Sequence, residues 1–112
     1  MEDKKFDYAL VVTIVNRGYS DEVMAAAREA GARGGTIMYA HGASANETDK
    51  FFGISIHPEK EMVLIVTDEE NRANLMRAIA NKVGIADEGA GITFSLPVNE
   101  ISGIAHFDKH DE

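Results

Sequence analysis

Four histidines are the residues of this chain best suited to bind a metal ion, because neutral imidazole is a common metal ligand. They are His41, His57, His106 and His110. Only the last two have the one-turn spacing that would place them on one face of a helix, and they lie in a segment without helix signals. Asp87 and Glu88 could bind a cation or act as a base, but acids in a glycine-rich turn are usually solvated. We therefore interpret the histidines as structural or surface residues and expect no metal site.

Nucleophilic catalysis has no suitable residue in this sequence. The chain contains no cysteine, and no serine lies in a nucleophile elbow or beside a plausible base. We therefore expect a protein without enzymatic activity. Residues 84–91 (GIADEGAG) instead suggest an anion site, because closely spaced glycines allow backbone N–H groups to converge on a phosphate. The segment matches neither a P-loop nor a GxGxxG motif, so a solvated turn stays the alternative.

The composition and charge of the chain exclude several classes of protein. Its 112 residues fit one domain, and 45% hydrophobic with 27% charged residues is ordinary globular composition. A formal net charge of −8 repels phosphate backbones, so we expect no nucleic acid binding. The amino end lacks the apolar core of a signal peptide, and no apolar run nears the roughly 20 residues that span a bilayer. Together with the absence of cysteine, these features favour a cytoplasmic protein that does not insert into membranes.

Hydrophobic periodicity predicts the elements that must hold these residues in place. Runs rich in β-branched residues predict strands, and apolar residues at helical spacing predict helices. Ser20 should cap the first helix, and a capping box of Thr67 and Glu70 should begin the second. Gly31 and Gly84 should end them. We expect strands at 8–15, 36–41, 62–66 and 92–98, helices at 20–30 and 68–83, extended chain at 51–56 and a bend at 57–60.

The order of these elements, βαββαβ, predicts a ferredoxin-like α+β fold. Its four-stranded antiparallel sheet should carry both helices on one face. We expect a single domain over residues 1–107 and an acidic tail at 108–112. The small, polar segment within 42–57 should leave the domain as a hairpin excursion, and it is where we expect the chain to contact another molecule.

The second face of the predicted sheet is also apolar. In two of the strands both alternating sets of side chains are largely hydrophobic, so neither set can face water. The sets are Leu10, Val12 and Ile14 with Val11, Thr13 and Val15 in one strand, and Met62, Leu64 and Val66 with Val63 and Ile65 in the other. A symmetric homo-oligomer with its sheets packed together would cover this face, and a covering C-terminal segment is the alternative.

The combination resembles the PII family of nitrogen-regulatory signalling proteins and its PII-like relatives over nearly the whole chain. The resemblance rests on GARGGT leading into a strand, on the excursion after Gly42 where the family has its T-loop, on the strand MVLIV, and on GIADEGAGITF where the family has its B-loop. Such proteins are trimers that bind adenine nucleotides in clefts between subunits and engage transporters, channels or enzymes with the T-loop. The resemblance therefore implies a homotrimer, a T-loop at about 42–57, a B-loop at about 84–91, and ATP, ADP or AMP as an effector rather than a required cofactor.

The resemblance also implies a ligand site, residue by residue. Thr36 matches the threonine that contacts adenine, and Val66 matches a valine whose backbone reads the base. Gly42 matches the glycine at the base of the T-loop, and Lys60 falls where the family keeps a lysine for phosphate or for 2-oxoglutarate. The B-loop part of the implied site comprises Gly89, Ala90 and Gly91.

Several positions depart from the family pattern. Ile92 stands at the B-loop lysine, and Gly103 and Ala105 stand at two C-terminal arginines that grip phosphate. Charge-assisted contacts to phosphate are strong, so their loss should weaken ATP binding by several kcal/mol. The family glutamine that helps to hold magnesium and 2-oxoglutarate aligns near Asn46, and the T-loop is shorter than usual and contains no tyrosine for uridylylation.

We interpret the chain as a PII-like signal-transduction regulator, with nitrogen regulation as the expected setting and a transporter or enzyme as the expected partner. One alternative is a trimeric divalent-metal tolerance protein that resembles the CutA family, with His41, His57, Asp87 and Glu88 as ligands. Another is a PII-like binding module with a non-functional nucleotide site.

Overall fold

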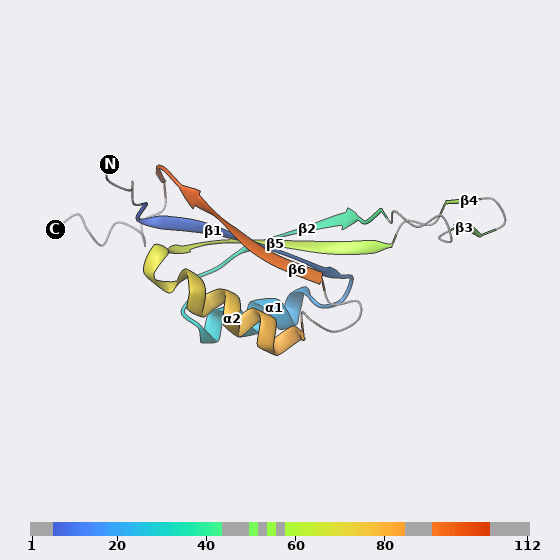
Figure 1. Cartoon of the computed structure of the whole chain (residues 1–112), viewed down its shortest axis with the longest axis horizontal. Helices are drawn as coiled ribbons and strands as arrows, with labels where there is room; N and C mark the ends of the chain where they lie inside the picture. Colours follow the sequence, from blue (N-terminus) through green and yellow to red (C-terminus); the bar gives the residue numbers. More distant parts are fainter. Residues whose placement is uncertain (1–5, 44–49, 52–53, 56–57, 85–90, 104–112) are drawn as a thin grey trace, which may run out of the picture.

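A computed structural model describes residues 6–43, 50–51, 54–55, 58–84 and 91–103. The chain forms a single four-stranded sheet layer with two helices packed beneath it (Figure 1). The elements are β1 (Tyr8–Asn16), α1 (Ser20–Glu29), β2 (Thr36–His41), β3 (Lys50–Phe51), β4 (Ile54–Ser55), β5 (Glu59–Asp68), the short 3-10 helix η1 (Glu69–Asn71), α2 (Arg72–Val83) and β6 (Gly91–Val98).

The strand order of the main sheet is β2-β5-β1-β6, and all its neighbours are antiparallel. This order, with both helices on one face, confirms the predicted ferredoxin-like fold. In the predicted extended segment at 51–56, the described residues Phe51, Ile54 and Ser55 are in strands, β3 and β4, which pair as a separate two-stranded sheet. The predicted bend at 57–60 is wrong for its second half, because Glu59 and Lys60 already belong to β5.

The hydrophobic core lies between the sheet and the helices. Side chains from one face of β1 and β5 meet the inward faces of α1 and α2, and they are almost completely buried. A polar pair completes this layer, because the Thr13 and Thr93 hydroxyls of β1 and β6 lie 3.0 Å apart and hydrogen-bond across the strands. The buried core residues are Val11, Val15, Val23, Met24, Ala26, Ala27, Val63, Ile65, Leu75 and Ile79.

The start of α1 is capped by a carboxylate from another element. The prediction that Ser20 is the N-cap is wrong, since Tyr19 takes that position and Ser20 is the first helical residue. The backbone N–H of Ser20 donates instead to Oε1 of Glu61 on β5, at 2.9 Å. A negative charge there also suits the positive end of the helix dipole. Hydrogen bonds from Ser20 hold the pKa of the Glu61 carboxyl below its ordinary value, against the opposing effect of burial.

The start of α2 also differs from the sequence prediction. Thr67 is a buried residue of β5, and η1 precedes a helix whose N-cap is Asn71, with no side-chain cap, so the capping box with Glu70 does not form. The predicted end is confirmed, because Gly84 adopts the left-handed conformation with φ 63° after Val83. Among the helices of the described residues, none is long and apolar enough to cross a membrane.

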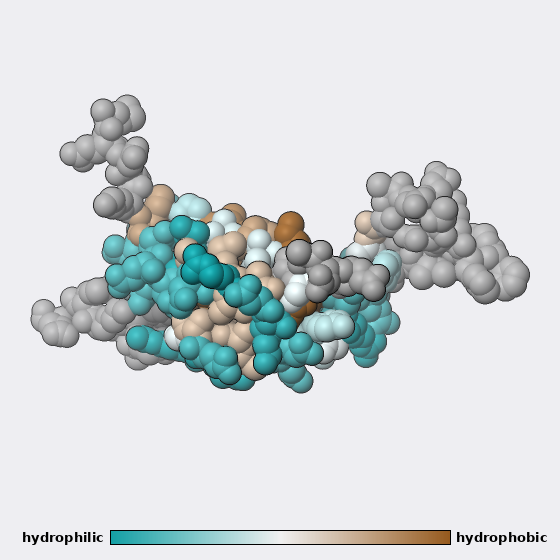
Figure 2. All heavy atoms as spheres, turned by 60° about the horizontal axis from the view of Figure 1, so that its bottom comes forward, coloured by the Kyte–Doolittle hydropathy of each residue, from teal (hydrophilic) through white to brown (hydrophobic). Residues whose placement is uncertain are grey.

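The opposite sheet face, which we call the open face, carries a continuous apolar surface. Strand register places Leu10, Leu64 and Phe94 among the residues that share it. Among the described residues no helix covers this side (Figure 1), whereas hydrophilic residues surround a smaller hydrophobic band on the outward surface of the helix layer (Figure 2). Large side chains of the open face stay exposed, including Ile92 at 53% and Leu96 at 46%. The predicted second apolar face is therefore confirmed. Its large apolar members are Leu10, Val12, Ile14, Met38, Met62, Leu64, Val66, Ile92, Phe94 and Leu96.

Candidate functional site

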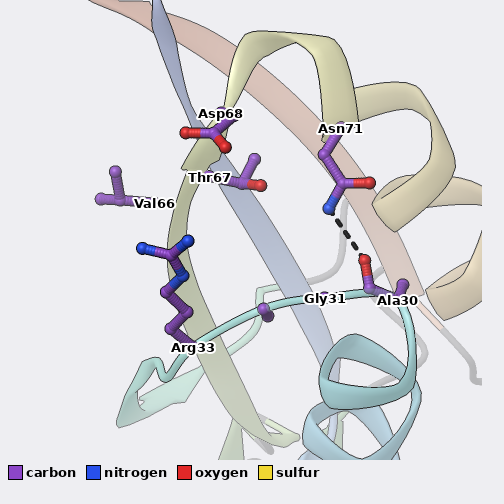
Figure 3. Close-up of a pocket in the computed structure, with 8 residues that line it drawn as sticks. Ala30, Gly31, Arg33, Val66, Thr67, Asp68 and Asn71 are labelled. Carbon is purple, nitrogen blue, oxygen red and sulfur yellow. Dashed lines mark hydrogen bonds between the residues drawn. The ribbon is translucent and has the colours of Figure 1, made fainter. Parts of the chain in front are cut away.

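Thr36 and Val66, two residues of the implied ligand site, lie near one end of the sheet. Thr36 begins β2 and is exposed, and it pairs with Leu64 of β5. Val66 lies two residues after Leu64 on β5, so the side chains of Thr36 and Val66 both belong to the open face. Next to Val66 is a pocket of about 160 Å³ (Figure 3). It is lined by Ala30, Gly31, Ala32, Arg33, Val66, Thr67, Asp68 and Asn71.

This pocket, which we call the Val66 pocket, is built by the exit of α1, the end of β5 and Asn71, the last residue of η1. The side-chain amide of Asn71 donates to the carbonyl of Ala30 at 2.8 Å and so ties the two segments together. Gly31 turns the chain with φ 101°, and a Cβ there would lie 3.3 Å from the Asn71 amide nitrogen. Figure 3 shows the Arg33 guanidinium and the Asp68 carboxylate along the β5 side of the pocket. The pocket therefore places alanine and valine methyl groups beside a cation, an acid and an amide.

Gly42 and Lys60 lie at the opposite end of β2 and β5, where the segment predicted to be a T-loop begins and ends. The Gly42 N–H donates to the carbonyl of Pro58 at 2.7 Å and closes the root of the loop. A Cβ on Gly42 would lie 3.0 Å from Cε of Lys60, so the glycine leaves room for the lysine stem. Half-buried Lys60 donates from Nζ to Oδ1 of Asn16 at 2.6 Å.

A second pocket, of about 210 Å³, lies at this loop root. It combines an aromatic ring with basic and acidic groups. The exposed ion pair between Arg17 and Glu59 contributes both charges, and Lys60 contributes a further cation. The pocket can therefore hold a small anion beside an aromatic side chain. Its lining residues are Arg17, Tyr39, Ala40, His41, Glu59 and Lys60.

Gly91 begins β6 at the same end of the sheet, opposite Val15. Its φ is 125°, and a Cβ would lie 1.8 Å from the carbonyl oxygen of Ile14, so only glycine fits this close approach of β6 to β1. The adjacent Ile92 points its exposed side chain to the open face. The other B-loop residues of the implied site, Gly89 and Ala90, lie outside the described residues, as does Ala105.

The structure therefore divides the described site residues into two groups within one chain. Thr36 and Val66 belong to one end of the sheet, and Gly42 and Lys60 belong to the other, which is also the end where β6 begins at Gly91. Val66 lies six residues beyond Lys60 on β5, which is about 20 Å at about 3.3 Å per residue. A single small ligand cannot contact both groups of the same chain.

Metal ligands do not gather in the part of the chain that the structure describes. Within these residues no three His, Asp or Glu side chains lie close enough to share an ion. His41 pairs with Glu59 across β2 and β5. The other residues of the metal hypothesis, His57, Asp87 and Glu88, lie outside the described residues.

The sequence prediction did not include Asn16, which accepts a hydrogen bond from Lys60, or Glu61, which accepts one from the start of α1. Glu61 carries a detectable signal, because a charged residue that shares a face with Val63 and Ile65 must be buried with a partner. Asn16 carries none, since its contact with Lys60 joins positions 44 residues apart.

Comparisons with known proteins agree with this geometry. A family model described as nitrogen regulatory protein P-II matches residues 8–106. The crystal structure of Arabidopsis thaliana PII bound to citrate is similar to this chain with a TM-score of 0.71 and 22% sequence identity, over 90% of this chain and 83% of that one. At that identity the likeness supports the fold alone. A search of curated proteins found no match.

Proposed function

The chain belongs to the nitrogen regulatory protein P-II family, and on that premise we propose a trimeric regulator that senses a small ligand between its subunits. Proteins of this family are regulators rather than enzymes. An adenine nucleotide is the first candidate ligand, and the T-loop, residues 42–57, would pass the signal to a transporter or enzyme. We place this regulator in the cytoplasm and expect a role in nitrogen regulation.

The open face supports the proposed trimer. Its exposed members include Met38, Phe94 and Leu96, each between 40% and 46% accessible in the single chain. A contiguous apolar surface of this kind is costly in water, and a symmetric assembly that turns the sheets toward one another would bury it. Light scattering of the purified protein tests this part, with a mass of three subunits as the expected result and a monomer at micromolar concentration as the contradicting one.

The division of the site residues carries the proposal of clefts between subunits. Because Val66 and Lys60 lie about 20 Å apart along β5, one nucleotide can reach both only when they come from different chains. The Val66 pocket of one subunit would hold the base, and the loop root of its neighbour would offer Lys60 to the phosphate end. The ligand would then contact the T-loop of the second subunit where it leaves the sheet.

Isothermal titration calorimetry with ATP, ADP, AMP, 2-oxoglutarate and citrate tests the ligand. Citrate is included because it is bound in the similar Arabidopsis structure. We expect at least one adenine nucleotide to bind, and we expect Lys60→Met to weaken it about tenfold through loss of a charge-assisted contact. Lys82→Met on the exposed face of α2 is the matched control. If no adenine nucleotide binds at millimolar concentration, the nucleotide part is wrong and the module with a non-functional site takes its place.

A further inference from the structure

Three consecutive residues at the start of β5 hold the turn between β1 and α1. Each of the three residues makes one of these contacts, and two of them, Glu59 and Glu61, are acids. Glu59 pairs with the Arg17 guanidinium, and its carbonyl accepts the Arg17 N–H at 3.2 Å. The Glu61 carboxylate accepts the Ser20 N–H at 2.9 Å. The strand that returns from the T-loop is therefore joined to the β1–α1 turn on both sides of Lys60.

Lys60 makes the third contact, and its chemistry differs from the other two. Its ammonium donates to the neutral side-chain amide of Asn16, with 2.6 Å between Nζ and Oδ1. A neutral oxygen satisfies one donor of an ammonium group but does not compensate its charge, and among the described residues no carboxylate forms an ion pair with Lys60. Arg17, by contrast, already has a carboxylate partner. An anion that enters the loop root would therefore gain more from Lys60 than Asn16 does.

We infer that Asn16 is a positioning residue that holds Lys60 in the ligand-free protein, and that an anionic ligand binds by taking Lys60 from Asn16. The inference rests on the proposed function, because it assigns a regulatory role to Lys60 within the same cleft. Asn16 then sets the affinity threshold of the site, since an anion that draws the ammonium group toward the loop root must break its hydrogen bond with the Asn16 amide.

The exchange also connects the ligand to the T-loop. Cε of Lys60 lies 3.0 Å from the position that a Cβ on Gly42 would take, and the Gly42 N–H donates to the Pro58 carbonyl across the loop root. A displacement of Nζ from Asn16 that also moves Cε shifts the lysine stem beside Gly42. The contact of Lys60 with Asn16 therefore couples the β1–α1 turn to the residues from which the T-loop begins.

Calorimetry on a double-mutant cycle tests this inference, with ATP, ADP, AMP, citrate and inorganic phosphate as probes. These probes separate phosphate from carboxylate ligands. Asn16→Ala should strengthen binding of the tightest probe by about three- to tenfold, because the competing hydrogen bond is gone. In a Lys60→Met background the same substitution should have no effect. Asn81→Ala, on the exposed face of α2, is the matched control, and thermal unfolding verifies that each variant is folded.

The possible outcomes separate this inference from the proposed function. If the wild type binds and Asn16→Ala binds no better than Asn81→Ala, the inference is overturned and the proposed function stands. If Asn16→Ala strengthens binding equally in the Lys60→Met background, Asn16 acts by another route and the inference is again overturned. If the wild type binds nothing and Asn16→Ala binds a probe, the inference is supported. If neither protein binds any probe, both the inference and the nucleotide part of the proposed function are wrong.

Discussion

Replacement of Glu61 should destabilise the fold more than replacement of any exposed acid, because it removes the partner of a buried helix terminus. The Glu61 side chain is only 6% exposed, and its carboxylate accepts the Ser20 N–H at 2.9 Å. Loss of an N-terminal cap costs about 0.5–2 kcal/mol, and a buried donor left without a partner costs about 1–3 kcal/mol. These two costs describe the same contact and overlap. We therefore expect Glu61→Ala to lower the free energy of unfolding by about 2 kcal/mol.

Glu61→Gln separates the charge from the hydrogen bond. Its amide oxygen can still accept the Ser20 N–H but no longer places a full negative charge at the helix end, which is worth about 0.3–1 kcal/mol. We expect Glu61→Gln to cost about 1 kcal/mol at neutral pH, between the wild type and Glu61→Ala. Glu70→Gln, at an exposed position of η1, is the control and should change stability by less than about 0.5 kcal/mol.

The same contact has a defined pH dependence. The folded-state pKa of Glu61 is lowered, chiefly by hydrogen bonds from Ser20, so the ionised carboxylate stabilises the fold. This contribution is complete above the ordinary glutamate value of 4.5 and is lost as the pH falls from there through the folded-state pKa. The difference in unfolding free energy between wild type and Glu61→Gln should therefore be constant near neutral pH and shrink in acid.

Urea unfolding followed by circular dichroism measures these differences. All proteins must be compared at one subunit concentration, because the stability of an oligomer depends on concentration. If Glu61→Ala unfolded at the same urea concentration as Glu70→Gln, the Glu61 carboxylate would not stabilise the start of α1. A gap between wild type and Glu61→Gln that widened as the pH fell below 4.5 would contradict the predicted pH dependence.

Two further substitutions test the sheet. Gly91→Ala should lower the free energy of unfolding in urea by at least about 2 kcal/mol, because its Cβ would lie 1.8 Å from a β1 carbonyl oxygen at a positive φ. Gly34→Ala is the control, and because a Cβ there would have no atom within 4 Å, it should cost less than about 1 kcal/mol. Equal midpoints for the two variants would contradict the register of β6. Phe94→Glu on the open face should shift the mass in light scattering from trimer toward monomer, since it places a charge in an apolar interface, while Asn81→Glu on α2 should not. A trimeric Phe94→Glu would exclude this face as the subunit contact.

The elements of the fold could be predicted because their hydrophobic patterns are strong. In β1 and β5 both faces are apolar, and Leu75 and Ile79 of α2 recur at helical spacing. Such patterns depend only on residues that are close together in the sequence, so a single sequence is enough to detect them. Glycines that end a helix are equally local, and Gly84 was predicted correctly for that reason.

Helix starts and the organisation of the site could not be predicted in the same way. The N-terminus of α1 is capped from β5 by Glu61, 41 residues away, so local capping rules pointed to Ser20 instead. The Asn16 contact with Lys60 is likewise formed only by strand register. The separation of Val66 from Lys60 along β5 is plain once both are placed in one strand, but only the whole sheet shows that they mark opposite ends of the domain.

Native mass spectrometry of the wild-type protein, mixed with each adenine nucleotide in turn, tests the central claim most directly. It reports the number of subunits and the number of bound ligands in the same spectrum. We expect a trimer that carries up to three molecules of at least one nucleotide, one for each cleft between subunits. A monomer that binds the nucleotide alone would contradict the shared cleft, and a trimer that stays free of every nucleotide at millimolar concentration would contradict the proposed ligand.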